Sequence, residues 1–130
     1  MIKEFENLRK EEVEILLRAP VLVSILIAGA DGNIDKAETK EAIAIARGRQ
    51  SRAREQLVDY YKVVGDNFED QFNELVSKFP LKPEERNPQI IAELKRLNRI
   101  LPKIDKNFSV KFHASLKDLA KRLRKPQVVC

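Results

Sequence analysis

The segment LVDYYKVVGDNFEDQFNELVSKF, residues 57–79, carries the clearest structural signal in this sequence. Its apolar side chains recur at steps of three and four residues, as they do along one face of an amphipathic α-helix. The period continues across Gly65, although Asp66 and Glu69 have the spacing of a capping box and could start a second helix. The segment therefore predicts helix with one buried face, in one piece or in two.

The helical period continues towards the C-terminus. Asn87 and Pro88 are typical of a helix start, with asparagine as the N-cap and proline at the first helical position. An apolar stripe follows them as far as Leu101. A last helix is predicted near residues 109–124, with Ser109 as its N-cap.

Towards the N-terminus, Pro20 is expected to kink or restart a helix before residues 21–30. No alternating segment is long enough to indicate a strand. We therefore expect an all-α fold in which residues 1–130 form a single compact helical domain. The predicted core consists of Leu26, Ile43, Tyr61, Phe68, Phe72, Leu94, Leu97, Leu116 and Leu119.

Composition agrees with a soluble globular protein, since 43% of the residues are hydrophobic and 35% are charged. The longest apolar run, residues 19–30, is too short to span a bilayer, and no signal peptide is expected. The one cysteine, Cys130, cannot form an internal disulfide. These features together predict a cytoplasmic protein.

The stretch ADGNIDKAE, residues 30–38, carries three carboxylates on one short turn. If Asp31 takes position 5 of an EF-hand loop, then Gly32, Asp35 and Glu38 fall at positions 6, 9 and 12, which suit such a loop. Positions 1 and 3 would have no side-chain oxygen, so the stretch is not an EF-hand. A hard cation could still bind the three carboxylates, together with backbone carbonyls and water.

The same residues also have a purely structural explanation. Asp31 and Gly32 favour a tight turn, because glycine adopts a positive φ without strain. Asp35 is a good N-cap, and Glu38 three residues later completes a capping box. The spacing alone leaves both interpretations open.

The segment LIAGADGNIDKAETKEAIAIA, residues 26–46, resembles the TerB-like family, which comprises the tellurite-resistance protein and its relatives. The shared pattern is an apolar helix ending in A-x-A-D-G, then an aliphatic residue, an acid and a glutamate that opens the next helix. The resemblance extends more loosely over most of the chain. It implies an all-helical fold and one divalent cation, calcium foremost, with Asp31 and Glu38 as ligands and Asp35 as a third. It also implies a role in a stress response of the tellurite-resistance type, or as a scaffold.

The family has a second D-G-x-x-x-x-x-E motif, and residues 97–123 look like a degenerate copy of the first. A shift of 74 positions puts Asp105 on Asp31. Lys106 then stands where the first motif has its glycine, and Phe112 where it has its glutamate. The resemblance therefore predicts two degenerate helix-turn-helix halves, at most one cation per chain, and an inward-facing Phe112.

An enzyme is not expected. His113 is the only histidine, so a histidine-based zinc site or a Ser-His-Asp triad has little material. Cys130 lacks a fixed base nearby, and the four glycines form no phosphate-binding loop. The sequence favours a non-enzymatic module with an unknown protein partner. The alternative is a helical protein-interaction domain that retains the fold without metal.

Charge is unevenly distributed along the chain. Residues 1–80 carry 12 basic and 15 acidic side chains, whereas residues 81–130 carry 13 basic and 5 acidic ones. The basic C-terminal half could contact an anionic membrane surface or nucleic acid, although a solvated basic surface on ordinary helices is the more usual explanation. The strip RGRQSRAR, residues 47–54, adds four arginines but no groove-reading motif. Nucleic acid therefore ranks below a protein or a membrane surface as a partner.

Overall fold

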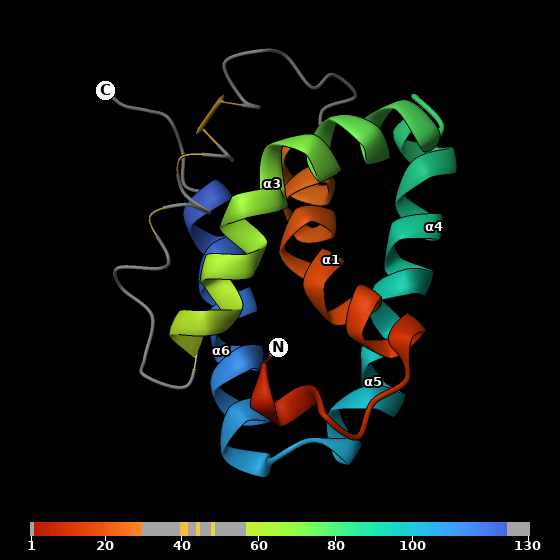
Figure 1. Ribbon diagram of the computed structural model, residues 1–130. Helices are drawn as coiled ribbons and strands as arrows, with labels where there is room; N and C mark the ends of the chain where they lie inside the picture. Colours follow the sequence, from red (N-terminus) through yellow and green to blue (C-terminus); the bar gives the residue numbers. More distant parts are fainter. Residues whose placement is uncertain (1, 30–39, 42–43, 45–47, 49–56, 125–130) are drawn as a thin grey trace.

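The computed structural model describes residues 2–29, 40–41, 44, 48 and 57–124 (Figure 1). The regular elements of these ranges are all helical, and none of them is a strand, so the predicted all-α class is confirmed. In chain order they are η1 (Lys3–Phe5), α1 (Lys10–Ala28), α3 (Val58–Lys78), α4 (Pro83–Lys95), α5 (Leu97–Ile100), η3 (Leu101–Lys103) and α6 (Lys106–Arg124).

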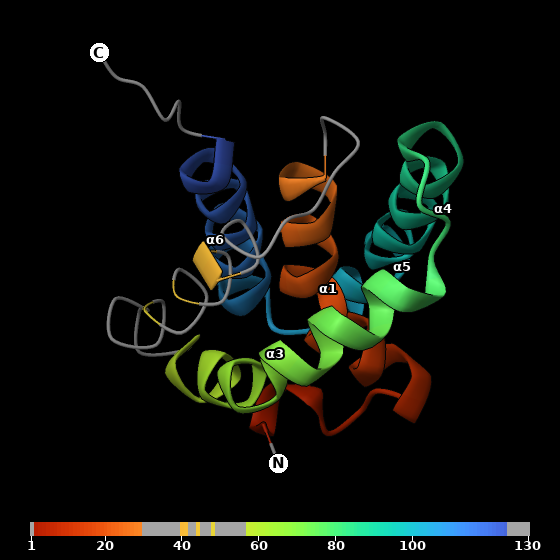
Figure 2. The same cartoon turned by 90° about the horizontal axis from the view of Figure 1, so that it is seen from above.

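Helix α1 lies at the centre of the packing, and α3, α4 and α6 all contact it. Figure 2 shows α1 between α6 and α4, with α3 crossing beside it. The second half of α1 is apolar around its whole circumference, and residues 19–25 are all buried. A helix of that kind must be covered on every side, which explains its central place. Within the described residues, no helix combines the length and the apolar character that a membrane crossing requires.

Pro20 does not restart α1, because the helix runs without interruption from Lys10 to Ala28. Proline has no N–H, so the carbonyl of Leu16, four residues earlier, loses its usual helical donor. The Tyr60 hydroxyl on α3 donates a hydrogen bond of 2.5 Å to that carbonyl. Burial raises the pKa of Tyr60 well above its usual value, which keeps the hydroxyl protonated as a donor. A side chain from another helix thus allows α1 to pass through its proline.

Helix α3 is also continuous, and it does not break at Gly65. Its buried face is the one that the period of three and four predicts, from Tyr60 and Tyr61 to Phe72 and Leu75. The possible second start at Asp66 is therefore not used.

Helix α4 begins earlier than predicted, at Pro83 instead of Pro88. Pro83 occupies the first helical turn, and Pro88 lies inside the helix. Pro88 and Glu84 are both exposed, so water can bind the Glu84 carbonyl that Pro88 leaves without an N–H.

Helix α6 also begins earlier than predicted. The Asp105 carboxylate accepts a hydrogen bond of 2.9 Å from the backbone N–H of Phe108, as an N-cap does. Ser109 is not the N-cap, since its hydroxyl donates to the Leu101 carbonyl at 3.0 Å. The earlier start places Phe108 one turn before Phe112, and the two buried rings stack with centroids 6.1 Å apart.

The core contains an aromatic cluster in which rings from η1, α3 and α6 meet edge to face. Phe112 is fully buried, as predicted. Of the predicted core, Leu26 and Leu94 are only partly buried, and Ile43 lies outside the described residues. The remaining predicted core residues, Tyr61, Phe68, Phe72, Leu97, Leu116 and Leu119, are buried.

Candidate functional site

The predicted cation ligands Asp31, Asp35 and Glu38 lie outside the described residues. The structure describes the chain up to Gly29, which caps the C-terminal end of α1. The surroundings of Gly29 are therefore the nearest described structure to the acidic segment, residues 30–38.

Arg86, on α4, holds the end of α1. Its side chain is buried, with 4% of the residue exposed. The Nη2 atom donates a hydrogen bond of 2.6 Å to the Gly29 carbonyl. A Cβ atom on residue 29 would lie 2.5 Å from that nitrogen, so any larger residue would force the buried guanidinium to move. The residue that precedes the acidic segment is thus tied to α4 by a buried guanidinium.

In the described part of the chain, no three His, Cys, Asp or Glu residues gather closely enough to hold a metal ion. His113 is exposed on α6.

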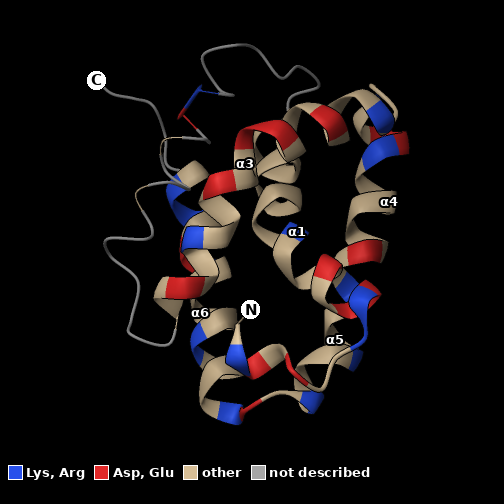
Figure 3. Cartoon of the chain, in the orientation of Figure 1, with Lys and Arg blue, Asp and Glu red and all other residues tan. Residues whose placement is uncertain are grey.

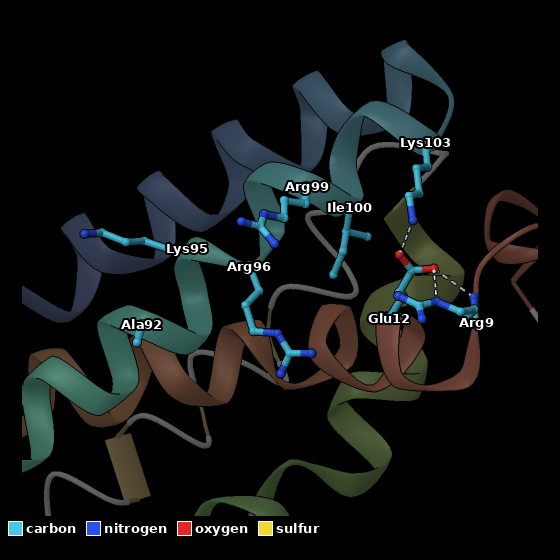
Figure 4. Close-up of a pocket in the computed structure, with 8 residues that line it drawn as sticks. All are labelled: Arg9, Glu12, Ala92, Lys95, Arg96, Arg99, Ile100 and Lys103. Carbon is cyan, nitrogen blue, oxygen red and sulfur yellow. Dashed lines mark hydrogen bonds and ion pairs between the residues drawn. The ribbon is translucent and has the colours of Figure 1, made fainter.

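A strongly charged hollow lies between the start of α1 and the segment formed by α4, α5 and η3 (Figure 4). We call it the basic pocket. Its volume is about 460 Å³. It is lined by Arg9, Glu12, Ala92, Lys95, Arg96, Arg99, Ile100 and Lys103. Five of these residues are cationic and one is acidic.

Sequence spacing explains why the cations share one side of this segment. Arg96, Arg99 and Lys103 follow one another at steps of three and four, as residues on one face of a helix do. Lys95 belongs to the last turn of α4, where a cation interacts favourably with the helix dipole. The opposite face of the segment, which includes Leu97, is buried in the core.

Glu12 is the one carboxylate of the pocket, and it is already bound. Its Oε2 accepts a hydrogen bond of 2.6 Å from Lys103 Nζ, and its Oε1 accepts one of 2.9 Å from the backbone N–H of Arg9. The Arg9 Nε lies 3.6 Å from the same Oε1. The hydrogen bond from Lys103, then that from the Arg9 backbone, lowers the pKa of Glu12 below its ordinary value, so the carboxylate stays ionised.

The other cations of the pocket have no such partner. Within the described residues, Lys95, Arg96 and Arg99 form no ion pair with a carboxylate. Figure 4 shows Arg96 and Arg99 between Lys95 on one side and the pair of Glu12 and Lys103 on the other. The pocket therefore presents uncompensated positive charge from a concave surface, which focuses the field on an anion.

A second hollow, between α1 and α3, provides a contrast. Its volume is about 280 Å³, and its lining includes Arg18, Glu74 and Lys78. These charges are balanced: Arg18 pairs with Glu93 at 3.1 Å, and Lys78 pairs with Glu74 at 2.9 Å. The hydrogen bond from Lys78 lowers the pKa of Glu74. This hollow does not favour a ligand of either sign.

Basic character is predicted for the C-terminal half from the sequence, but the pocket is not. Figure 3 shows that basic residues dominate α6 while acidic residues dominate α3. The steps from Arg96 to Lys103 could have been found in the sequence. The contribution of Arg9 could not, because it comes from the first half of the chain and reaches the pocket only through packing.

Comparison with known proteins adds no relative. No family model matches the chain, and neither the search of curated proteins nor the search of solved structures found a match. The resemblance to the TerB-like family therefore stays a prediction from residues 26–46.

Proposed function

We propose that this chain is a non-enzymatic helical binding module that holds an anionic partner in the basic pocket. One observation carries the proposal. Lys95, Arg96 and Arg99 line a hollow of about 460 Å³ and pair with no carboxylate of the described chain. The carboxylate beside them, Glu12, is already bound by Lys103. An anion entering the pocket would therefore meet positive charge that is not yet neutralised.

The test is binding of a polyanion, such as heparin, at low and high salt. The variant Arg96→Gln, Arg99→Gln should weaken retention on immobilised heparin. The matched control is Lys117→Gln, Lys121→Gln, which removes the same charge from exposed positions of α6 that do not line the pocket. Equal retention of the two double variants would contradict the proposal, because heparin would then respond to the net charge of the protein and not to the cations of the basic pocket.

A second candidate function is the one that the TerB-like resemblance implies. In it, Asp31, Asp35 and Glu38 bind one divalent cation, calcium foremost, in a module of two degenerate helix-turn-helix halves. The role would be a cytoplasmic stress response of the tellurite-resistance type, or a scaffold for a protein partner. The buried contact between Arg86 and Gly29 supports this candidate, since it fixes the helix end that leads into the acidic segment.

Calorimetry of the metal-free chain with calcium, magnesium, manganese and zinc tests the second candidate. Replacement of Asp31 by Asn should weaken binding strongly, because hard cations gain most from anionic oxygens. Asp35→Asn should leave the fold intact, since asparagine also caps helices. Equal heats in the wild type and in an Asp31→Asn, Glu38→Gln variant would mean that the acidic segment is structural. Two equivalent ions per chain would contradict the predicted loss of the second motif.

A further inference from the structure

The chemistry of the basic pocket restricts the kind of anion that it can take. Arg96 and Arg99 each present a planar guanidinium with five N–H donors, which matches two oxygens of one phosphate group at a time. Their spacing of three residues places both side chains on one side of the α4–α5 junction. Two such forks on the lining of one hollow suit a ligand with several phosphate groups better than one isolated charge.

The edges of the pocket supply further donors to the same ligand. Lys103 has three N–H donors, and Glu12 Oε2 accepts one of them. Arg9 is mostly exposed, with 75% of its side chain accessible, and its Nε lies 3.6 Å from Glu12 Oε1. Lys95 lies at the other end of the row. With five cationic residues and one carboxylate, the lining of the pocket has a net charge of +4. A compact ligand with several negative charges would neutralise it best.

The lining also argues against other anions. A volume of about 460 Å³ falls in the range of small-molecule sites. Of the described residues that line the pocket, only Ala92 and Ile100 are apolar, and none is aromatic. A nucleic-acid strand would find no ring on which to stack a base, and an acyl chain would find little apolar surface.

From these features we infer that the basic pocket recognises a compact anion with clustered phosphate groups, read chiefly by the guanidinium groups of Arg96 and Arg99. The inference rests on the proposed anion-binding function and narrows it to one ligand chemistry. Two sources can supply that chemistry, a free polyphosphate-type anion and the multiply phosphorylated headgroup of a membrane lipid.

Titration of the full chain with inorganic tripolyphosphate in a calorimeter tests the inference. We expect one ion per chain, and affinity reduced about tenfold by each of the substitutions Arg96→Gln and Arg99→Gln, since each removes charged hydrogen bonds. The control Lys117→Gln, Lys121→Gln should bind within about twofold of the wild type, because it only weakens the general field. Far-ultraviolet dichroism of each variant verifies that its helices are intact.

The variant Arg96→Lys, Arg99→Lys keeps the charge and removes the planar fork. It should lose most of the affinity that the glutamine variant loses. Binding equal to that of the wild type would overturn the inference, because plain charge would then suffice. The anion-binding function would survive that result.

Two further arms separate the sources and the competing ligand. Vesicles that contain a lipid with a multiply phosphorylated inositol headgroup are compared with phosphatidylserine vesicles of equal surface charge. If the chain binds the inositol-lipid vesicles selectively, and the Arg96→Gln, Arg99→Gln variant loses this binding, the lipid headgroup is a source of the ligand. If the chain binds tripolyphosphate but not these vesicles, the source is the free anion. A single-stranded oligonucleotide is the competing ligand. If it binds through these arginines and tripolyphosphate does not, the inference is overturned, whereas the proposed anion-binding function still holds. If the binding of none of these probes depends on Arg96 and Arg99, both the inference and the proposed anion-binding function are overturned.

Discussion

The two ends of α1 are each held by a cation from the α4–η3 segment, but the two contacts differ in burial. At the C-terminal end, the guanidinium of Arg86 is buried and donates to the Gly29 carbonyl at 2.6 Å. At the N-terminal end, the Lys103 ammonium donates to the buried Glu12 carboxylate at the same distance, yet 51% of the Lys103 side chain is exposed.

The difference separates a contact that maintains the fold from one that can serve a ligand. A buried donor that loses its acceptor has no water to replace it, so the contact between Arg86 and Gly29 is costly to break. Water reaches the half-exposed Lys103 ammonium and can replace it beside the buried Glu12 carboxylate, so this contact is expected to be less costly to break. The N-terminal end of α1 can therefore carry uncompensated positive charge beside it, whereas the C-terminal end is fixed.

The largest effect is expected at the buried end. Arg86→Met should lower the free energy of unfolding by about 3 kcal/mol, because it removes charged hydrogen bonds and leaves the buried Gly29 carbonyl without a donor. Urea unfolding at pH 7 measures the change. The matched control, Arg99→Met, alters an exposed arginine of the basic pocket and should change stability by less than about 0.5 kcal/mol. Equal losses of unfolding free energy in the two variants would contradict the distinction between a contact that maintains the fold and residues that can serve a ligand.

The middle of α1 provides a second buried contact. Tyr60→Phe should cost about 2 kcal/mol, because the Leu16 carbonyl that Pro20 leaves free would then have no donor. In a Pro20→Ala background the restored N–H can bond to the same carbonyl, so the cost of Tyr60→Phe should fall. A double-mutant cycle by urea unfolding measures this coupling. Additive effects would show that the tyrosine does not substitute for the missing donor.

Gly65 offers a smaller change of the opposite sign. It lies inside α3, and a Cβ atom there would meet no atom within 4 Å. Gly65→Ala should therefore stabilise the protein by about 0.5–1 kcal/mol, since alanine loses less backbone entropy in a helix. Gly29→Ala is the counterpart at the fixed end of α1 and should destabilise it, because its Cβ would collide with Arg86. A thermal scan in which both variants shift in the same direction would contradict this contrast.

The last prediction concerns the N-terminal end of α1 and is a dependence of stability on pH. Because the pKa of Glu12 is lowered in the folded state, its contribution to stability is present above its ordinary pKa of 4.5. That contribution is lost as the pH falls through the lowered value. Glu12→Gln should therefore flatten the acid side of the stability curve, measured by urea unfolding at a series of pH values. An unchanged acid limb would mean that Lys103 does not stabilise the carboxylate.

The helical class and the buried faces could be predicted from the sequence, whereas several helix starts could not. Pro83 and Pro88 both suit a first helical position, and Asp105 and Ser109 both suit an N-cap. Local chemistry does not choose between such alternatives. The packed structure uses the earlier start each time, and in it Arg86 on α4 binds Gly29 and Phe108 stacks on Phe112.

The sequence by itself determined the period of the helices and the inward face of α3, because near-neighbour geometry sets which side chains share a helix face. It also supplied the acidic segment, whose cation remains a prediction. Only the tertiary structure decided the basic pocket. Glu12 and Lys103 are 91 positions apart, and no local rule brings them together. Packing of α1 against α4 and α5 does so, and it leaves Arg96 and Arg99 unpaired within the described chain because the carboxylate beside them is already bound.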